Sequence, residues 1–192
     1  MKIVVGLGNP GAEYSGTRHN VGYDVIRELI RRWQPGRSQM KYSSEIWEIV
    51  LGSEKVLLVC PLTYMNRSGD AVQPLIRFYQ LPTAEVVVIC DDMNLPAGRL
   101  RWRANGSAGG QKGLSDIIQK LGTEDIPRLR MGIGRPPGRM DVTAFVLGKF
   151  RPDEKDLAEI AVQTAADSVE MWVRSGITSV MNQFNRSADS PE

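Results

Sequence analysis

The sequence predicts a single-domain α/β sandwich, in which helices flank a mixed, largely parallel, twisted sheet. Short apolar runs bounded by turn residues alternate with longer segments of helical periodicity, and this alternation is typical of a sheet covered by helices. With 192 residues and 42% hydrophobic content, the chain is long enough to bury one substantial core. We therefore expect one domain over residues 1–186, followed by a disordered tail at residues 187–192.

The first half of the chain predicts a strand, a helix, a hairpin and a second helix. The hairpin follows from a turn, Leu51-Gly52-Ser53-Glu54, between two runs of strand-like residues. In order, the predicted segments are a strand at residues 2–7, a loop to residue 17, a helix at 21–33, hairpin strands at 42–50 and 55–60, and a helix at 69–80.

The second half predicts shorter elements and then a long C-terminal helix. Gly176 is a suitable residue to end that helix, because glycine adopts the left-handed conformation that closes a helix without strain. In order, the predicted segments are strands at 86–90 and 98–103, a helix at 114–121, a strand at 128–133, and helices at 153–174 and 178–184.

The net charge of +2 hides a strong asymmetry along the chain. Residues 97–151 carry eleven Lys/Arg against four Asp/Glu, whereas residues 152–192 carry three against eight. A basic segment beside an acidic one predicts a local phosphate-binding face. A solvated surface with charges at helix ends explains the same segment equally well on charge alone.

The cysteines and the apolar runs indicate a soluble, cytoplasmic protein. Cys60 and Cys90 each end an apolar run, where a thiol behaves as a small buried side chain, so we expect both to be reduced and structural. No apolar run approaches the roughly 20 residues that a membrane span needs, and residues 3–8 are too few for a signal segment. We expect no membrane association.

The glycines Gly6-Leu-Gly8-Asn-Pro-Gly11 follow the first predicted strand and match the dinucleotide-binding fingerprint G-x-G-x-x-G. A nucleotide-dependent reductase is therefore one alternative, with Asp24 and Glu28 as available acids. However, a dinucleotide site needs a helix that opens at the glycines, and the next helix is predicted only near Asn20. The same residues fit better as a loop that supplies a functional site.

The only histidine, His19, lies in this loop, with Asn9 and Asn20 nearby. Imidazole is the side chain whose ordinary pKa suits proton exchange near neutral pH, so His19 is the one imidazole candidate for a general base. Asp91 and Asp92 follow another strand, at the edge of the sheet where α/β proteins bind ligands. One of these carboxylates can orient the imidazole, although a turn-forming or magnesium-binding pair fits the same sequence.

Two further loops offer groups that bind phosphates or bases. The glycine-rich segment at residues 106–113 contains Lys112, which with backbone amides suits a phosphate or an oxyanion. Residues 61–66 follow a strand and supply Tyr64 and Asn66. Each loop also has a purely structural interpretation, in which residues 106–113 form an ordinary surface loop and Tyr64 packs against the core.

Together these segments resemble the bacterial peptidyl-tRNA hydrolase family. The motifs occur in order from residue 1 to about residue 184. They are Gly-Leu-Gly-Asn-Pro-Gly, Thr-Arg-His-Asn-Val-Gly, Pro-Leu-Thr-Tyr-Met-Asn-Arg-Ser-Gly, Asp-Asp-Met-Asn-Leu-Pro-Ala-Gly, Gly-Ser-Ala-Gly-Gly-Gln-Lys-Gly-Leu and Arg-Met-Gly-Ile-Gly-Arg-Pro.

The resemblance implies an esterase that cleaves peptide from the terminal ribose of peptidyl-tRNA and so recycles the tRNA. By motif, His19 is the general base that activates water, Asp91 orients it, and Asn9 lies beside the scissile bond and helps reject substrates with a free α-amino group. Tyr14, Tyr64 and Asn66 are expected to line the channel for the peptide and the terminal adenosine. We expect a monomer without metal or cofactor, whose segment 97–151 binds the tRNA backbone.

One position departs from the family pattern, because many relatives have His-Asn where this chain has Gln111-Lys112. An ammonium group stabilises an oxyanion or contacts a phosphate, but it cannot accept a hydrogen bond as an amide does. This departure leaves a second class open, an RNA-binding relative that has lost turnover. The presence of His19, Asp91 and Asn9 favours the enzyme.

Overall fold

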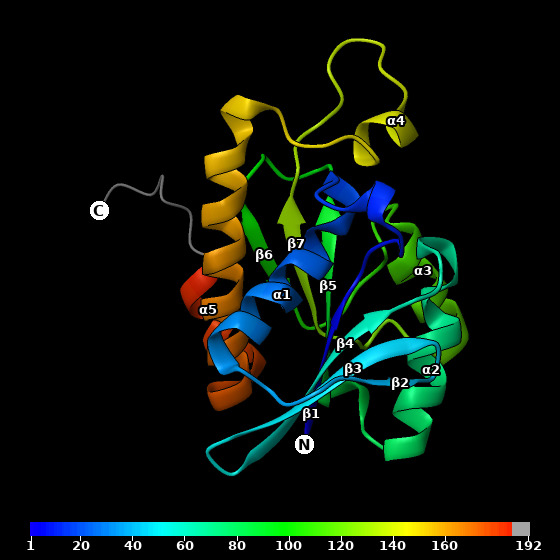
Figure 1. The fold of residues 1–192 in the computed structure, drawn as a ribbon, viewed down its shortest axis with the longest axis vertical. Coiled ribbons are helices and arrows are strands. Elements are labelled where there is room, and N and C mark those ends of the chain that lie inside the picture. Colours follow the sequence, from blue (N-terminus) through cyan, green and yellow to red (C-terminus); the bar gives the residue numbers. More distant parts are fainter. Residues whose placement is uncertain (186–192) are drawn as a thin grey trace.

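The structure, a computed structural model, describes residues 1–185 and contains a seven-stranded mixed sheet with helices on both faces (Figure 1). The strands are β1 (Lys2–Gly6), β2 (Gln39–Lys41), β3 (Ser44–Leu51), β4 (Glu54–Pro61), β5 (Val86–Asp92), β6 (Leu100–Arg103) and β7 (Arg128–Gly132). Their order across the sheet is β2-β3-β4-β1-β5-β7-β6. The predicted tail at residues 187–192 lies outside the described residues.

The centre of the sheet is parallel and its two edges are antiparallel. Strands β4, β1, β5 and β7 run parallel to one another, whereas β2–β3, β3–β4 and β6–β7 pair antiparallel. The predicted α/β sandwich with a mixed sheet is confirmed. Strand β2 was not predicted, because its three residues are all exposed and give no burial pattern.

The helices are α1 (Val21–Trp33), α2 (Ser68–Tyr79), α3 (Lys112–Leu121), α4 (Val142–Val146) and α5 (Pro152–Phe184), with short 3-10 turns η1 (Ala12–Tyr14), η2 (Arg18–Asn20), η3 (Met65–Arg67) and η4 (Thr83–Glu85). The break predicted at Gly176 is confirmed, since this residue (φ 76°) interrupts α5. Helix α4 was not predicted. Its signal is Asp141, whose side chain accepts a hydrogen bond from the backbone N–H of Ala144 and caps the helix.

Two hydrophobic cores, one on each face of the sheet, follow from the alternation of side chains along the central strands. On β1, Val4 packs with residues of α1 and α5, whereas Ile3 and Val5 pack with residues of α2 and α3. Figure 1 shows the same division, with α1 and α5 over one face and α2 and α3 over the other. β1 and β5 are buried on both faces, which explains their continuous apolar runs.

Gly6, the first glycine of the G-x-G-x-x-G match, and Gly22 on α1 allow close packing of α1 on β1. A Cβ atom on Gly6 would lie 2.3 Å from the carbonyl oxygen of Gly22, and one on Gly22 would lie 2.4 Å from the backbone nitrogen of Leu7. The chain after Gly11 forms η1 and η2, and α1 begins only at Val21. No helix opens at the glycines, so the geometry of a dinucleotide site is not formed here.

Arg18 anchors η2 to the region around the α4–α5 connection. Because His19 lies on η2, its position is fixed as well. The guanidinium group of Arg18 donates to the carbonyl oxygen of Lys149 (2.7 Å), pairs with Glu154 (2.6 Å) and lies 4.4 Å from the ring centre of Phe145. Arg18 is buried, so these partners replace its lost water. The N-terminal loop and the C-terminal third of the chain are thereby held together.

Candidate active site

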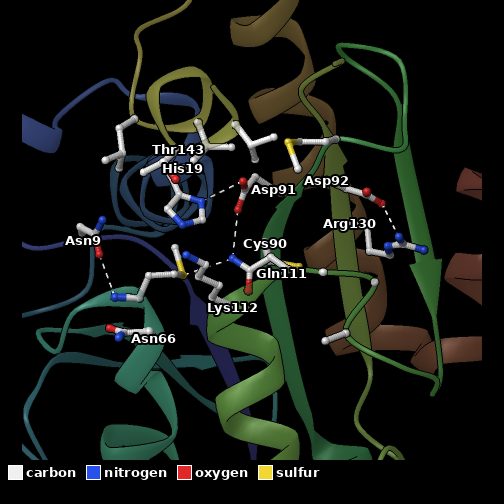
Figure 2. Close-up of a pocket in the computed structure, with 18 of the residues that line it drawn as sticks. Asn9, His19, Asn66, Cys90, Asp91, Asp92, Gln111, Lys112, Arg130 and Thr143 are labelled. Carbon is white, nitrogen blue, oxygen red and sulfur yellow. Dashed lines mark hydrogen bonds and ion pairs between the residues drawn. The ribbon is translucent and has the colours of Figure 1, made fainter. Parts of the chain in front are cut away.

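The polar groups that the sequence singled out come together beyond the carboxyl ends of the parallel strands. There they surround a cavity of about 320 Å³, whose lining includes Asn9, His19, Tyr64, Asn66, Asp91 and Lys112 (Figure 2). Asn9 and His19 follow β1, Tyr64 and Asn66 follow β4, Asp91 lies at the end of β5, and Lys112 is the first residue of α3. This placement agrees with the rule that α/β sheets bind ligands at this edge.

His19 and Asp91 form a hydrogen-bonded pair at the cavity. His19 Nδ1 lies 2.8 Å from Asp91 Oδ2, and the two side chains are 11% and 4% exposed. Since an ionised carboxylate can only accept, Nδ1–H is the donor and Nε2 of the neutral ring is left with its lone pair. The ring is thus held in the tautomer that accepts a proton at Nε2.

Asp92, the second member of the acidic pair, points away from His19. Its Oδ2 lies 2.6 Å from Arg130 Nη2, and its Oδ1 accepts from the backbone N–H of Asn94 (2.8 Å). Figure 2 shows the two carboxylates directed to opposite sides of β5. The two aspartates therefore have separate tasks, and only Asp91 belongs to the imidazole pair.

Asn9 is held by two neighbouring segments. Its backbone N–H donates to Asn20 Oδ1 and its carbonyl accepts from Asn20 Nδ2, each at 2.9 Å. Its Oδ1 accepts from the backbone N–H of Met65 at 2.8 Å. Because Oδ1 is engaged, the Nδ2 amide is the part of Asn9 that can donate to a ligand in the cavity.

Gln111 completes the polar floor of the cavity. It is the N-cap of α3, where its Oε1 accepts from the backbone N–H of Leu114 at 2.7 Å. Its Nε2 donates to Asp91 Oδ1 at 3.0 Å and lies 3.2 Å from Met65 Sδ. Sequence reasoning identified Gln111 only as a departure from the family pattern and missed this contact, as it missed the bonds of Asn20 to Asn9. The only sequence signal for this role is the position of Gln111 just before a predicted helix, and glutamine is not among the preferred N-cap residues.

The remaining walls are aromatic and apolar. Tyr64 is 59% exposed at the edge of the cavity, next to Met65 and Asn66. Val142, Val146 and Leu147, from α4 and its C-terminal end, form the opposite wall. In Figure 1 this short yellow helix lies beyond the ends of the strands.

Tyr14, also predicted as a site residue, does not line this cavity. It ends η1, is half-buried, and its carbonyl oxygen accepts from the hydroxyl of Thr17 at 2.8 Å. Its predicted contact with a substrate therefore requires a ligand that extends beyond the cavity.

Cys90 lies at the floor of the cavity but is not a candidate nucleophile. Burial raises the pKa of its thiol, and the neighbouring carboxylates of Asp91 and Asp92 raise it further. The thiol is thus protonated at neutral pH and unreactive. This leaves the imidazole of His19 as the group in the cavity suited to accept a proton near neutral pH.

A sheet covered on both faces, with a hydrogen-bonded imidazole and amide side chains around a cavity at its carboxyl edge, is the arrangement of an α/β protein that binds its ligand at the ends of its parallel strands. Comparison with known proteins makes this specific. The family model of peptidyl-tRNA hydrolase matches residues 3–192, and the chain belongs to this family.

Individual relatives agree over nearly the whole chain. Peptidyl-tRNA hydrolase of Rhodopirellula baltica is 49% identical over 96% of this chain and 97% of its own length, and that of Syntrophomonas wolfei is 48% identical over 96% and 100%. Among solved structures, peptidyl-tRNA hydrolase of Acinetobacter baumannii superposes with a TM-score of 0.90 at 34% identity, covering 96% of this chain and 94% of that one. Within residues 1–185, no helix combines the length and apolar character that a membrane span requires.

Proposed function

We propose that this protein hydrolyses the ester bond between the peptide and the terminal ribose of peptidyl-tRNA, and thereby returns tRNA to translation in the cytoplasm. The observation that carries the proposal is the His19–Asp91 pair, 2.8 Å between Nδ1 and Oδ2, at a cavity in a member of this family. The proposed reaction uses water, one base and hydrogen-bond donors, without a metal or cofactor.

In this proposal His19 activates the attacking water. The oxygen of a water molecule beside Nε2 attacks the carbonyl carbon of the ester while one of its protons moves to Nε2. Asp91 stabilises the imidazolium ion that forms. The bond between the carbonyl carbon and the ribose oxygen then breaks, and the proton passes from Nε2 to that oxygen. The products are a ribose hydroxyl and a peptide carboxylic acid, which releases the second proton of the water to solvent and becomes a carboxylate.

The negative charge that develops on the carbonyl oxygen needs hydrogen-bond donors directed at that oxygen. Two cavity groups are suited to this task, the Nδ2 amide of Asn9 and the ammonium group of Lys112, which is the first residue of α3. An ammonium group supplies a full charge as well as a hydrogen bond, which makes it a stronger stabiliser of an oxyanion than a neutral amide. Lys112 is thus compatible with turnover in place of the family's asparagine.

The other walls of the cavity suit the remaining parts of the substrate. The exposed ring of Tyr64 is available to stack on the terminal adenine, with Asn66 beside it. The apolar wall formed by Val142, Val146 and Leu147 suits peptide side chains. We assign to Asn9 the rejection of substrates with a free, charged α-amino group, because its side chain is held by the backbone N–H of Met65 in the cavity that His19 also lines.

The basic segment at residues 97–151 is the proposed contact surface for the tRNA backbone, although only part of it is available. Arg128 is buried and donates to backbone carbonyls, and Lys120 pairs with Asp70 and Asp116. Arg103 and Arg135, by contrast, are exposed. These exposed groups are the ones expected to neutralise phosphates.

The proposal is tested by comparing two substrates, N-acetyl-aminoacyl-tRNA and the same aminoacyl-tRNA with a free amino group. We expect the wild-type protein to release the amino acid from the blocked substrate and to spare the free one. Equal rates for both would refute the assigned selectivity. No release from either, with tRNA binding intact, would place the protein among RNA-binding relatives without turnover.

A further inference from the structure

The side chain of Gln111 connects a helix to the catalytic pair. It is 8% exposed at the N-cap of α3, where its two polar atoms have different partners. Oε1 accepts from Leu114 N–H (2.7 Å), and Nε2 donates to Asp91 Oδ1 (3.0 Å). One neutral amide therefore caps the helix and contacts the carboxylate that orients His19.

The carboxylate of Asp91 is in turn held by two donors from different elements. Oδ2 accepts from His19 Nδ1–H on η2, and Oδ1 accepts from Gln111 Nε2–H at the start of α3. Rotation of the carboxylate about its Cβ–Cγ bond would break both bonds at once. The plane of the carboxylate, and with it the direction in which Nε2 of His19 points, is therefore fixed only while both donors are present.

We propose that Gln111 is a positioning residue for catalysis, which acts through Asp91 to hold the imidazole of His19 in its working orientation. This inference rests on the hydrolase function proposed above. Figure 2 shows the arrangement, with Gln111 on one side of Asp91 and His19 on the other.

The chemistry of glutamine explains why this residue type suits the position. The site requires an acceptor for the helix and a donor for Asp91 on one planar group, which the amide of Gln111 provides, as the neutral imidazole found here in many relatives also would. Serine caps a helix as well but is too short to span this gap, and glutamate has the length but presents an acceptor to Asp91. A lysine or arginine would donate, but its positive charge would compete with the imidazolium ion for the charge of Asp91.

The contact also links the two sides of the cavity. Gln111 Nε2 lies 3.2 Å from Met65 Sδ, and the backbone N–H of Met65 donates to Asn9 Oδ1. The base on one side and the amide assigned to the ester carbonyl on the other are thus held by one chain of contacts. These contacts therefore set the relative position of the His19 imidazole and the Asn9 amide, which must act on the same ester group.

The kinetic test uses Gln111→Ser and Gln111→Thr, which both retain an oxygen for the N-cap but are too short to donate to Asp91. We expect kcat for N-acetyl-aminoacyl-tRNA to fall about 10- to 100-fold in each variant, with KM nearly unchanged. Gln119→Ser, the same change on the exposed face of α3, is the control and should retain wild-type kcat.

A double-mutant cycle separates an action through Asp91 from a general structural defect. In an Asp91→Ala background the carboxylate is absent, so adding Gln111→Ser should lower kcat by less than about twofold. An equal loss in both backgrounds, or wild-type kcat in both Gln111 variants, would overturn the proposal.

A second measurement does not depend on turnover. Because His19 is the only histidine, ¹⁵N NMR of untagged, histidine-labelled protein reports this one ring. We expect the wild-type spectrum to show protonated Nδ1 and unprotonated Nε2, and Gln111→Ser to shift the tautomer signals toward a mixture. An unchanged spectrum would refute the positioning role. An inactive wild-type protein would instead refute the proposed function, and the spectra would still decide whether Gln111 holds the pair.

Discussion

At the scale of single residues, the proposed chemistry depends on how one imidazole, that of His19, is oriented. His19 and Asp91 lie on different elements, η2 and β5, and the distance of 2.8 Å between them fixes the tautomer that leaves Nε2 free. Asp91 is buried and ionised carboxylates in such sites stabilise the imidazolium ion that base catalysis creates. Its charge is therefore as important to the proposed rate as its geometry.

Replacing Asp91 with asparagine tests this charge. The amide keeps the size of the side chain but removes the negative charge and favours the wrong tautomer, so we expect kcat to fall by about 100-fold or more. Steady-state kinetics with N-acetyl-aminoacyl-tRNA measure the effect. Asp92→Asn removes the same charge one residue away and leaves the pair intact, so its kcat should stay at least about tenfold above that of Asp91→Asn. Equal losses would contradict the separate tasks of the two aspartates.

The candidate catalytic residues could be predicted from the sequence, but the residues that position them could not. His19 was identifiable because it is the only histidine. The apolar strand marked Asp91 and Asp92 alike, and the choice of Asp91 followed from the family resemblance. Gln111 and Asn20 were not identifiable as partners of Asp91 and Asn9, because an amide side chain fits many surfaces and loops equally well. Their roles depend on contacts between segments that only the folded chain brings together.

At the scale of elements, α1 positions the site because it packs unusually close to β1. Long periodic helices and apolar strands were predictable, whereas β2 and α4 were not, since three exposed residues and one helical turn carry little pattern. The glycines of the first loop matched a nucleotide motif in sequence. In the structure Gly6 and Gly8 instead lie against α1, a difference from a nucleotide site that depends on where the helix begins.

Gly22→Ala tests this close packing. The added Cβ would lie 2.4 Å from the backbone nitrogen of Leu7 and 2.5 Å from its oxygen, so α1 must move away from β1. We expect a loss of about 2–3 kcal/mol in the free energy of unfolding, measured by urea denaturation. Gly36→Ala adds the same methyl group where nothing lies within 4 Å and should change stability by less than about 0.5 kcal/mol. Equal stability of the two variants would show that the helix accommodates the methyl group.

At the scale of the whole molecule, the basic segment at residues 97–151 spans β6, α3, β7 and α4, whereas the acidic residues between positions 153 and 170 lie on α5. Individual basic residues differ in what they can contact, because Arg128 is buried while Arg103 and Arg135 are exposed. The window of charge predicted from sequence therefore overstates the surface available to RNA. Some of the basic residues are buried and so cannot contact RNA, and composition does not reveal which ones.

Charge reversal of Arg103 or Arg135 to glutamate is expected to weaken tRNA binding and to reduce the slope of log K against log salt by about one per lost phosphate contact. Binding titrations at several salt concentrations measure this slope. Arg174→Glu is the matched control, since Arg174 is exposed on α5 and pairs with Glu170, and its slope should equal that of the wild type. Unchanged slopes in both test variants would place the tRNA on another surface.

The buried thiols predict a loss of stability at alkaline pH. Burial raises the pKa of Cys60 from 9.0 to about 12. Between these values the unfolded chain releases a proton that the folded chain retains, so the free energy of unfolding falls as pH rises above 9. Under reducing conditions, Cys60→Ala should lose about 1 kcal/mol less than the wild type between pH 8 and pH 10. Identical losses in urea unfolding would show that Cys60 does not contribute to this pH dependence.

The most direct test of the central claim is single-turnover hydrolysis of N-acetyl-aminoacyl-tRNA by the wild type and by His19→Ala, with tRNA affinity measured in parallel. The proposal predicts that the rate falls by about 100-fold or more while the affinity for tRNA is retained, because only the base that activates water is lost. Hydrolysis by His19→Ala at the wild-type rate would contradict the assignment of His19 as the base and, with it, the proposed reaction.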